Sequence, residues 1–66
     1  MKQLRINGES KELAVATIHD IIDHYNLLSK PVVAEVDGSI VSRELWSETE
    51  VRSGMTIELV HFVGGG

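Results

Sequence analysis

The stretch TIHDIIDHY, residues 17–25, decides the fold because it is the segment with a clear helical pattern. Its apolar residues recur at the spacing that places them on one stripe of a 3.6-residue helix: Ile18, Ile21, Ile22 and Tyr25. Thr17 can cap this helix, and Asp20 in the first turn is favoured by the helix dipole. A helix with one apolar stripe must bury it on one surface, which the rest of the chain has to supply.

A β-hairpin is expected before the helix. Leu4-Arg5-Ile6 alternates apolar and polar residues, as a half-buried strand does. Asn7-Gly8 follows, and this pair is favoured in type I′ turns because both residues accept a positive φ. The segment from Ser10 to Val15 can then pair back antiparallel to the first strand.

After the helix the chain is expected to return to extended structure. Pro31 excludes further helix, and Asp37-Gly38 is a second turn pair of the kind found in hairpins. The expected segments are a strand at 32–36, a short return strand at 39–41, an irregular segment with a short 3₁₀ turn at 42–47, and the most regular strand at 56–63.

Trp46, the one tryptophan of the sequence, falls in the irregular segment. We interpret it as a lid over the end of a small core. Contact with a partner protein is the alternative interpretation, because exposed aromatic side chains often anchor interfaces.

The order of these elements predicts an α+β fold. One mixed sheet of four to five strands, packed on one helix, is the most economical way to bury a single apolar stripe. The last strand most simply pairs beside the first. This is the β-grasp arrangement, with a domain over residues 1–63 and a flexible C-terminal glycine tail at 64–66.

The length and the ligand-forming residues restrict the possible functions. A chain of 66 residues holds one domain with a small core, and ligand pockets usually exceed about 300 Å³, so a self-contained enzyme is not expected. The sequence has no cysteine, which excludes disulfides and thiolate metal sites and fits the cytoplasm. His19 and His24 lie about 140° apart around a helix, and His61 is on a distant strand, so no metal site is expected.

The charge pattern restricts the class of partner. Ten acidic and six basic residues give a net charge of −4. The basic residues are scattered along the chain, so a nucleic-acid partner is not expected, and the acidic balance suits a partner with a basic surface. No apolar stretch approaches the roughly 18 residues of a membrane span, so no membrane association is expected.

The last strand predicts a candidate docking surface. Its alternation points Ile57 and Leu59 into the core, and therefore points Val60 and Phe62 outward. Val33 is expected to lie near them on a neighbouring strand. Contiguous exposed apolar side chains tend to mark interaction sites, so we interpret this group as a docking surface, with incidental exposure as the alternative.

Three glycines, Gly64 to Gly66, end the sequence. A frayed end or a cloning remnant would explain them. A tail built to enter another protein is the alternative, because glycine has no Cβ and can follow a narrow channel without a side-chain clash. Three extended residues reach about 10 Å, and their distinctive chemical group is the terminal carboxylate.

The chain resembles ubiquitin and its prokaryotic relatives, and among these it is most similar to the family of thiamine-biosynthesis sulfur carriers. The resemblance covers the whole chain. It is carried by the length, the start from Leu4 to Gly8, the helix after Thr17-Ile18, the stretch from Ile40 to Trp46 and, above all, the end from Val60 to Gly66. The wider family needs two terminal glycines, and this chain has three.

The resemblance implies a role for each residue of the tail. A ubiquitin-activating-like adenylyltransferase would adenylate the carboxylate of Gly66, and a sulfur donor such as a cysteine desulfurase would supply the sulfur of a thiocarboxylate. Thiazole synthase would then accept that sulfur. Gly65 and Gly64 would form the tail motif, and Val60, Phe62 and Val33 would dock partners. The chain itself would be a protein co-substrate without catalytic residues, and ATP and Mg²⁺ would belong to the activating partner.

Two other functions stay open. A molybdopterin-type sulfur carrier has the same Gly-Gly terminus, although that relative is typically longer. A non-covalent interaction module of ubiquitin-like fold, with a frayed or residual glycine end, belongs to a different class. Chemistry at Gly66 separates both carriers from the module.

Overall fold

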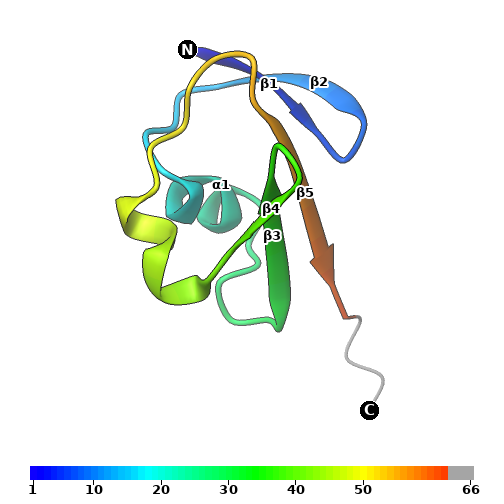
Figure 1. The fold of residues 1–66 in the computed structure, drawn as a ribbon, viewed down its shortest axis with the longest axis vertical. Helices are drawn as coiled ribbons and strands as arrows, with labels where there is room; N and C mark the ends of the chain where they lie inside the picture. Colours follow the sequence, from blue (N-terminus) through cyan, green and yellow to red (C-terminus); the bar gives the residue numbers. More distant parts are fainter. Residues whose placement is uncertain (63–66) are drawn as a thin grey trace.

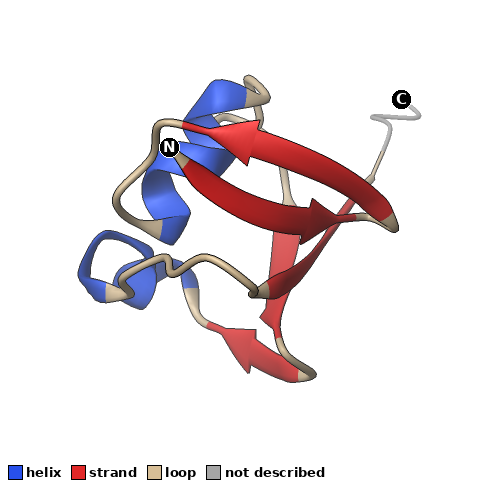
Figure 2. Cartoon of the chain, turned by 90° about the horizontal axis from the view of Figure 1, so that it is seen from above, coloured by secondary structure: helices blue, strands red, loops and turns tan. Residues whose placement is uncertain are grey.

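The fold is known from a computed structural model, which describes residues 1–62. Within these residues a five-stranded sheet packs on one α-helix, with the strands in the order β2-β1-β5-β3-β4 (Figure 1). The elements are β1 (Lys2–Ile6), β2 (Glu9–Leu13), α1 (Ile18–His24), β3 (Val32–Val36), β4 (Ser39–Val41), the 3₁₀ helix η1 (Arg43–Glu48) and β5 (Thr56–His61). Figure 2 shows the helices gathered on one side of the sheet. The predicted architecture is confirmed.

Both predicted hairpin turns are present. Asn7 and Gly8 have φ values of 50° and 82°, and Asp37 and Gly38 have values of 49° and 89°. Two successive positive φ values are the mark of a type I′ turn, whose twist matches that of the paired strands. The first turn sets Ile6 opposite Glu9, and the second sets Val36 opposite Ser39.

β5 lies in the middle of the sheet and joins its two halves. It runs parallel to β1, with Ile6 opposite Ile57, and antiparallel to β3, with Ala34 opposite Leu59. The predicted pairing of the last strand beside the first is therefore confirmed. The described part of β5 ends at His61, and the predicted strand end at 63, the domain boundary there and the tail at 64–66 lie outside the described residues.

The turn residues also fix β5 through their side chains. The amide oxygen of Asn7 accepts a hydrogen bond from the Leu59 N–H at 2.8 Å. The carboxylate of Asp37 accepts one from the Thr56 N–H at 2.9 Å. Each hairpin therefore contributes a polar side chain that holds the central strand in register.

The helix begins with the cap that the sequence predicts. The Thr17 hydroxyl accepts a hydrogen bond from the Asp20 N–H at 3.3 Å, and the Asp20 carboxylate accepts from Thr17 N–H at 3.0 Å and from Ala16 N–H at 2.9 Å. These bonds form a capping box. Because two backbone N–H groups donate to it, the pKa of Asp20 is lowered from its usual value.

The core lies between α1 and the inner face of the sheet. Ile18, Ile21 and Ile22 are fully buried, whereas Tyr25 caps the C-terminal end and is half-buried. The sheet contributes the residues that alternate inward, and the connecting segments add three more. The buried set is Leu4, Ile6, Ile18, Ile21, Ile22, Leu27, Ala34, Trp46, Val51, Ile57 and Leu59.

Trp46 belongs to this core. Its side chain is 1% exposed, and its indole N–H donates a hydrogen bond to the Val41 carbonyl at 3.0 Å. The Arg43 guanidinium lies 4.6 Å from the centre of the indole ring and donates to the carbonyls of Leu28 and Lys30. The interpretation as a lid over the core is confirmed, and Trp46 offers no surface to a partner.

Two boundaries differ from the sequence-based expectation. β2 ends at Leu13 instead of Val15, because the chain turns there toward a different neighbour: the Ala16 carbonyl accepts from the Val51 N–H at 2.9 Å. The segment expected to be irregular with one short turn is a longer 3₁₀ helix, η1, which packs against α1.

The core assignment predicts a large difference between two isoleucines. Ile57→Ala should lower the free energy of unfolding by about 2–5 kcal/mol, because it removes a fully buried side chain from the middle of the sheet. Ile40→Ala is the control, since Ile40 is 69% exposed and its loss should change stability by about 0.5 kcal/mol or less. Denaturant unfolding monitored by Trp46 fluorescence measures both, and equal losses would contradict this core.

The capping box predicts a pH-dependent effect of Asp20→Asn. Folding lowers the pKa of this carboxyl, so its contribution is present above the usual value of 3.8 and is lost as the pH falls through the folded value. The variant should therefore melt below the wild type at neutral pH, and this difference should shrink as the solution becomes acidic. Asp23→Asn, on the same helix, is the control. A difference in melting temperature that stays constant from neutral to acidic pH would show that the charge of Asp20 contributes nothing.

Candidate functional site

The outer face of the sheet, opposite α1, carries the predicted docking residues. Val33 on β3 and Val60 on β5 lie directly opposite each other in the antiparallel register. Val33 is 39% exposed, Val60 53% and Phe62, just past the end of β5, 63%. We call these three side chains the apolar patch. The exposure of the three side chains, and the pairing of Val33 with Val60, agree with the alternation read from the sequence. The docking role of the patch stays a prediction.

The patch is held in place by the central position of β5. Ile57 and Leu59 are buried against the core, so the alternation of the strand leaves Val60 no inward position. Beyond the strand, the Phe62 N–H donates to the Pro31 carbonyl at 3.3 Å, which ties the backbone of Phe62 to the start of β3. The patch therefore lies on ordered backbone.

Three residues beside the patch were missed by the sequence analysis. Glu35 on β3 is opposite Glu58 on β5, and Ile40 on β4 is opposite Glu35 on its other side. These three side chains continue the outer face from the apolar patch toward β4. The Asp37-Gly38 turn could have identified Ile40, because a two-residue hairpin loop fixes the pairing of the strands that it joins.

The patch lies at the end of the sheet from which the tail leaves. β5 runs from Thr56 to His61, so Val60 is its last outward residue, and Phe62 follows the strand directly. Gly64, Gly65 and Gly66, the predicted tail motif and modification site, lie outside the described residues. A protein that binds the patch therefore lies close to Phe62, where the described residues end.

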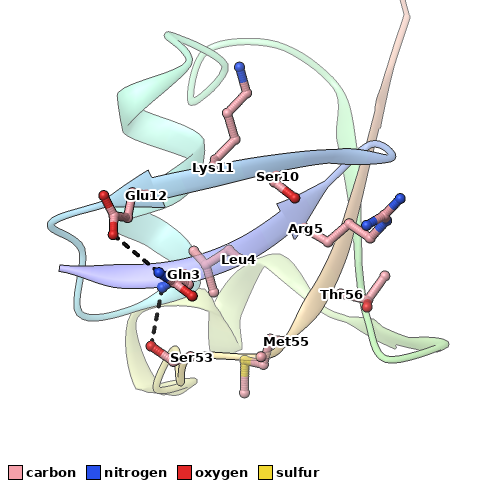
Figure 3. A pocket seen from close by; sticks show the side chains of 10 residues that line it. Gln3, Leu4, Arg5, Ser10, Lys11, Glu12, Ser53, Met55 and Thr56 are labelled. Carbon is pink, nitrogen blue, oxygen red and sulfur yellow. Dashed lines mark hydrogen bonds between the residues drawn. The ribbon is translucent and has the colours of Figure 1, made fainter.

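A groove on the same face covers the other half of the sheet (Figure 3). It has a volume of about 810 Å³ and lies over β1, β2 and the segment from Ser53 to Thr56. Gln3 crosses its floor, where its side-chain amide donates to the Glu12 carboxylate at 3.3 Å and its backbone N–H donates to the Ser53 hydroxyl at 3.1 Å. The groove is open, so it lacks the enclosure that small-molecule sites have.

A smaller hollow lies on the inner face, where the end of α1 meets β2 and β5. It has a volume of about 280 Å³ and is lined by Tyr25, Lys11 and His61, among others. Lys11 forms an ion pair with Glu9 at 3.1 Å, and this contact raises the pKa of Lys11. Within residues 1–62 no group of three or more His, Cys, Asp or Glu side chains is placed to hold a metal ion. The helices in this same range include none long and apolar enough to cross a membrane.

Comparison with known proteins identifies the family. The sequence model described as the ThiS family matches residues 4–66. The chain is 37% identical over 65 residues to the sulfur carrier protein ThiS of Bacillus subtilis (strain 168), and the match covers 96% of this chain and 98% of the relative.

Two solved structures share the fold. The crystal structure of the thiamine biosynthesis protein ThiS from Geobacter metallireducens has a TM-score of 0.78 at 25% identity, with 97% of this chain and 99% of that chain covered. The solution structure of a thiamine biosynthesis protein from the same organism has a TM-score of 0.79 at 25% identity, with 97% and 87% covered. With a family match over nearly its whole length and a relative at this identity, the chain belongs to the ThiS family.

Proposed function

We propose that this chain is a sulfur carrier protein, like its Bacillus relative, and that it serves thiamine biosynthesis, like the Geobacter protein of the same fold. The observation that carries the proposal is the family match, which extends from Leu4 through the terminal Gly66. The position of the exposed apolar patch at the base of that terminus supports it. In this proposal the chain is a protein co-substrate in the cytoplasm, and its reactive group is the carboxylate of Gly66.

The proposed chemistry activates that carboxylate in two steps. A carboxylate oxygen attacks the α-phosphorus of ATP, pyrophosphate leaves, and an acyl-adenylate forms. Sulfur at the oxidation level of hydrosulfide then attacks the carbonyl carbon, the C–S bond forms, and AMP leaves with the electrons of the C–O bond. The product is a thiocarboxylate, whose sulfur is a better nucleophile than the oxygen that it replaces. A cysteine desulfurase is the proposed source of this sulfur: it delivers a persulfide, and a thiol reductant supplies the two electrons that bring the outer sulfur to the hydrosulfide level.

The proposed partners follow from this chemistry. A ubiquitin-activating-like adenylyltransferase would bind ATP and Mg²⁺ and enclose the tail, and thiazole synthase would accept the sulfur. Residues without a Cβ at positions 64–66 would leave the carbonyl carbon open to attack from either side. Val33, Val60 and Phe62 would give both partners an apolar surface to bind, since aromatic and aliphatic side chains surrounded by polar ones commonly anchor interfaces.

The comparisons favour thiamine biosynthesis over the molybdopterin-type alternative. Both solved structures are named as thiamine biosynthesis proteins, and the Bacillus relative shares the name ThiS with one of them. A non-covalent interaction module differs from both carriers in needing no chemistry at Gly66. The following experiment separates it from them.

The carrier proposal predicts a covalent change at Gly66. Incubation with a ThiS-activating adenylyltransferase, ATP, Mg²⁺ and a sulfur donor should raise the intact mass by the difference between one sulfur and one oxygen. Fragmentation should place the change on the last residue. Deletion of Gly66 should abolish it while leaving the melting temperature unchanged, because the buried core of the described residues ends at Leu59. An unchanged mass for the full chain, with an enzyme that modifies the Bacillus relative in parallel, would refute the carrier proposal.

If Phe62 docks a partner, its replacement should weaken binding to that partner and leave the stability of the free protein unchanged. Phe62→Ala should weaken binding to the adenylyltransferase by about 1–3 kcal/mol if the ring fills a pocket on the partner. Its melting temperature should stay close to that of the wild type, because the side chain is 63% exposed. Leu45→Ala is the control, since Leu45 is an exposed apolar residue on η1, outside the patch. Equal affinity of both variants, measured by calorimetry, would remove Phe62 from the interface.

A further inference from the structure

We propose that Asn7 is a modification site. At the Asn7-Gly8 turn the folded protein loses ammonia, closes a cyclic imide, and reopens it with water to aspartate or isoaspartate. The isoaspartate form breaks the contacts by which Asn7 holds β5. The modification uses no partner of the proposed function, so it can be tested independently of that function.

Asn7 is held by β5 through both its main chain and its side chain. Its backbone N–H donates to the Ile57 carbonyl at 3.0 Å, and its side-chain oxygen accepts from the Leu59 N–H at 2.8 Å. These bonds fix the amide group of an exposed residue. A hydrogen bond to the amide oxygen also stabilises the negative charge that this oxygen gains when a nucleophile adds to Cγ. The side-chain amide is therefore a positioned and polarised electrophile.

Gly8 supplies an unhindered nucleophile. Within residues 1–62 its backbone N–H donates to no backbone carbonyl. Gly8 is exposed, its φ is 82°, and a Cβ at this position would meet no other atom within 4 Å. A side chain on the residue after an asparagine hinders the approach of its nitrogen to Cγ, and glycine has no side chain. Rotation about the Cα–C bond of Asn7 brings this nitrogen toward Cγ, and the open space around the turn leaves room for that rotation.

Water is the co-reactant of the proposed reaction. The Gly8 nitrogen gives its proton to solvent and forms a bond to Cγ of Asn7. The C–N bond of the side-chain amide breaks, and ammonia leaves with that electron pair and a proton from solvent. Water then adds to either carbonyl carbon of the cyclic imide. Ring opening gives aspartate or isoaspartate, and no group is oxidised or reduced.

The second asparagine of the chain provides an internal comparison. Asn26 also has a positive φ, 60°. It is followed by Leu27, a buried residue whose N–H donates to the Ile22 carbonyl at 3.0 Å. Because this nitrogen is already bonded and lies beside a side chain, Asn26 lacks the nucleophile that Gly8 provides to Asn7.

One product leaves the fold intact. Aspartate at position 7 keeps an oxygen that can accept from the Leu59 N–H. The equivalent turn of the second hairpin shows that a carboxylate fits such a position, because Asp37 accepts from the Thr56 N–H at 2.9 Å. Formation of aspartate should therefore change the charge of the protein and preserve the contact with β5.

The other product alters the pairing of β1 with β5. Isoaspartate lengthens the main chain by one carbon and leaves its carboxylate directly on Cα. A two-residue turn fixes the register of its strands, so a longer main chain disturbs that register. The register between β1 and β5 comprises only Arg5 opposite Thr56 and Ile6 opposite Ile57. Loss of the contacts of Asn7 therefore weakens the attachment of the central strand.

The test incubates the folded protein at neutral and mildly alkaline pH in water labelled with heavy oxygen. Each deamidation in the incubation introduces one labelled oxygen, which separates it from deamidation during sample preparation. Peptide mapping with fragmentation locates the label and distinguishes aspartate from isoaspartate. Asn26 in the same sample is the internal control. Gly8→Asp is the matched variant, because aspartate tolerates a positive φ better than most residues and places a side chain beside the nitrogen.

We expect label at position 7, formed faster at alkaline pH, and an unlabelled Asn26. Gly8→Asp should slow the labelling of Asn7. The isoaspartate form, purified by chromatography, should melt about 4–8 °C or more below the wild type, as expected for the loss of a hydrogen bond in a domain of this size. Asn7→Asp should melt close to the wild type, because it keeps the acceptor for Leu59.

Three results would overturn the inference. Equal persistence of Asn7 and Asn26 would show that the hydrogen bonds of the turn protect Asn7 instead of activating it. Label at position 7 that forms only in urea-unfolded protein would show the same. If position 7 is modified and the isoaspartate form melts like the wild type, the effect on β5 is refuted. None of these results concerns the chemistry of Gly66, so the proposed function is tested separately.

Discussion

The fold depends on the burial of one isoleucine stripe. The α1 helix extends only from Ile18 to His24, and isolated helices shorter than about 12–15 residues are marginal in water. Its capping box satisfies the N–H groups of Thr17 and Asp20, but the packing of the three isoleucines on the sheet supplies most of the driving force. Each strand that completes the inner face is therefore needed to keep the helix.

The burial of the core also fixes which side chains of β5 lie on the outer face. The strand pairs with both β1 and β3, so its register is fixed from two sides. A shift by one residue would expose Ile57 and Leu59 and bury Glu58, at a cost that the small core could not compensate. The positions of Val60 and Glu58 on the surface are thus set by the core, whereas their chemical identity is free to serve a partner. Fold and recognition use alternate residues of the same strand.

Much of this could be predicted from local signals. The two Asx-Gly pairs predict their turns because few other residues tolerate successive positive φ values, and Thr17 with Asp20 predicts the cap. The end of β2 and the length of η1 were not predicted, because both depend on contacts between residues far apart in the sequence. β2 stops early because Ala16 bonds to Val51, far along the chain, and η1 is extended by its packing on α1. Local patterns contain no information about such distant neighbours.

For the candidate site, the sequence predicts which side chains point outward but not which of them lie opposite each other. Alternation alone identifies Val60 and Phe62 as outward, since the strand has a clear apolar phase. The opposition of Glu35 and Glu58 requires the register between two strands that are distant in sequence, and only the three-dimensional structure gives it. The role of the glycine tail rests on family membership, because three glycines have no side chains from which a fold-based argument could start.

A carrier also has to leave each partner after its step. An apolar surface alone would gain affinity by growing, and a larger one would slow release from the enzyme and invite self-association. A compact apolar patch among exposed polar side chains avoids this, because its small area limits the contact and its polar neighbours keep the free surface hydrated.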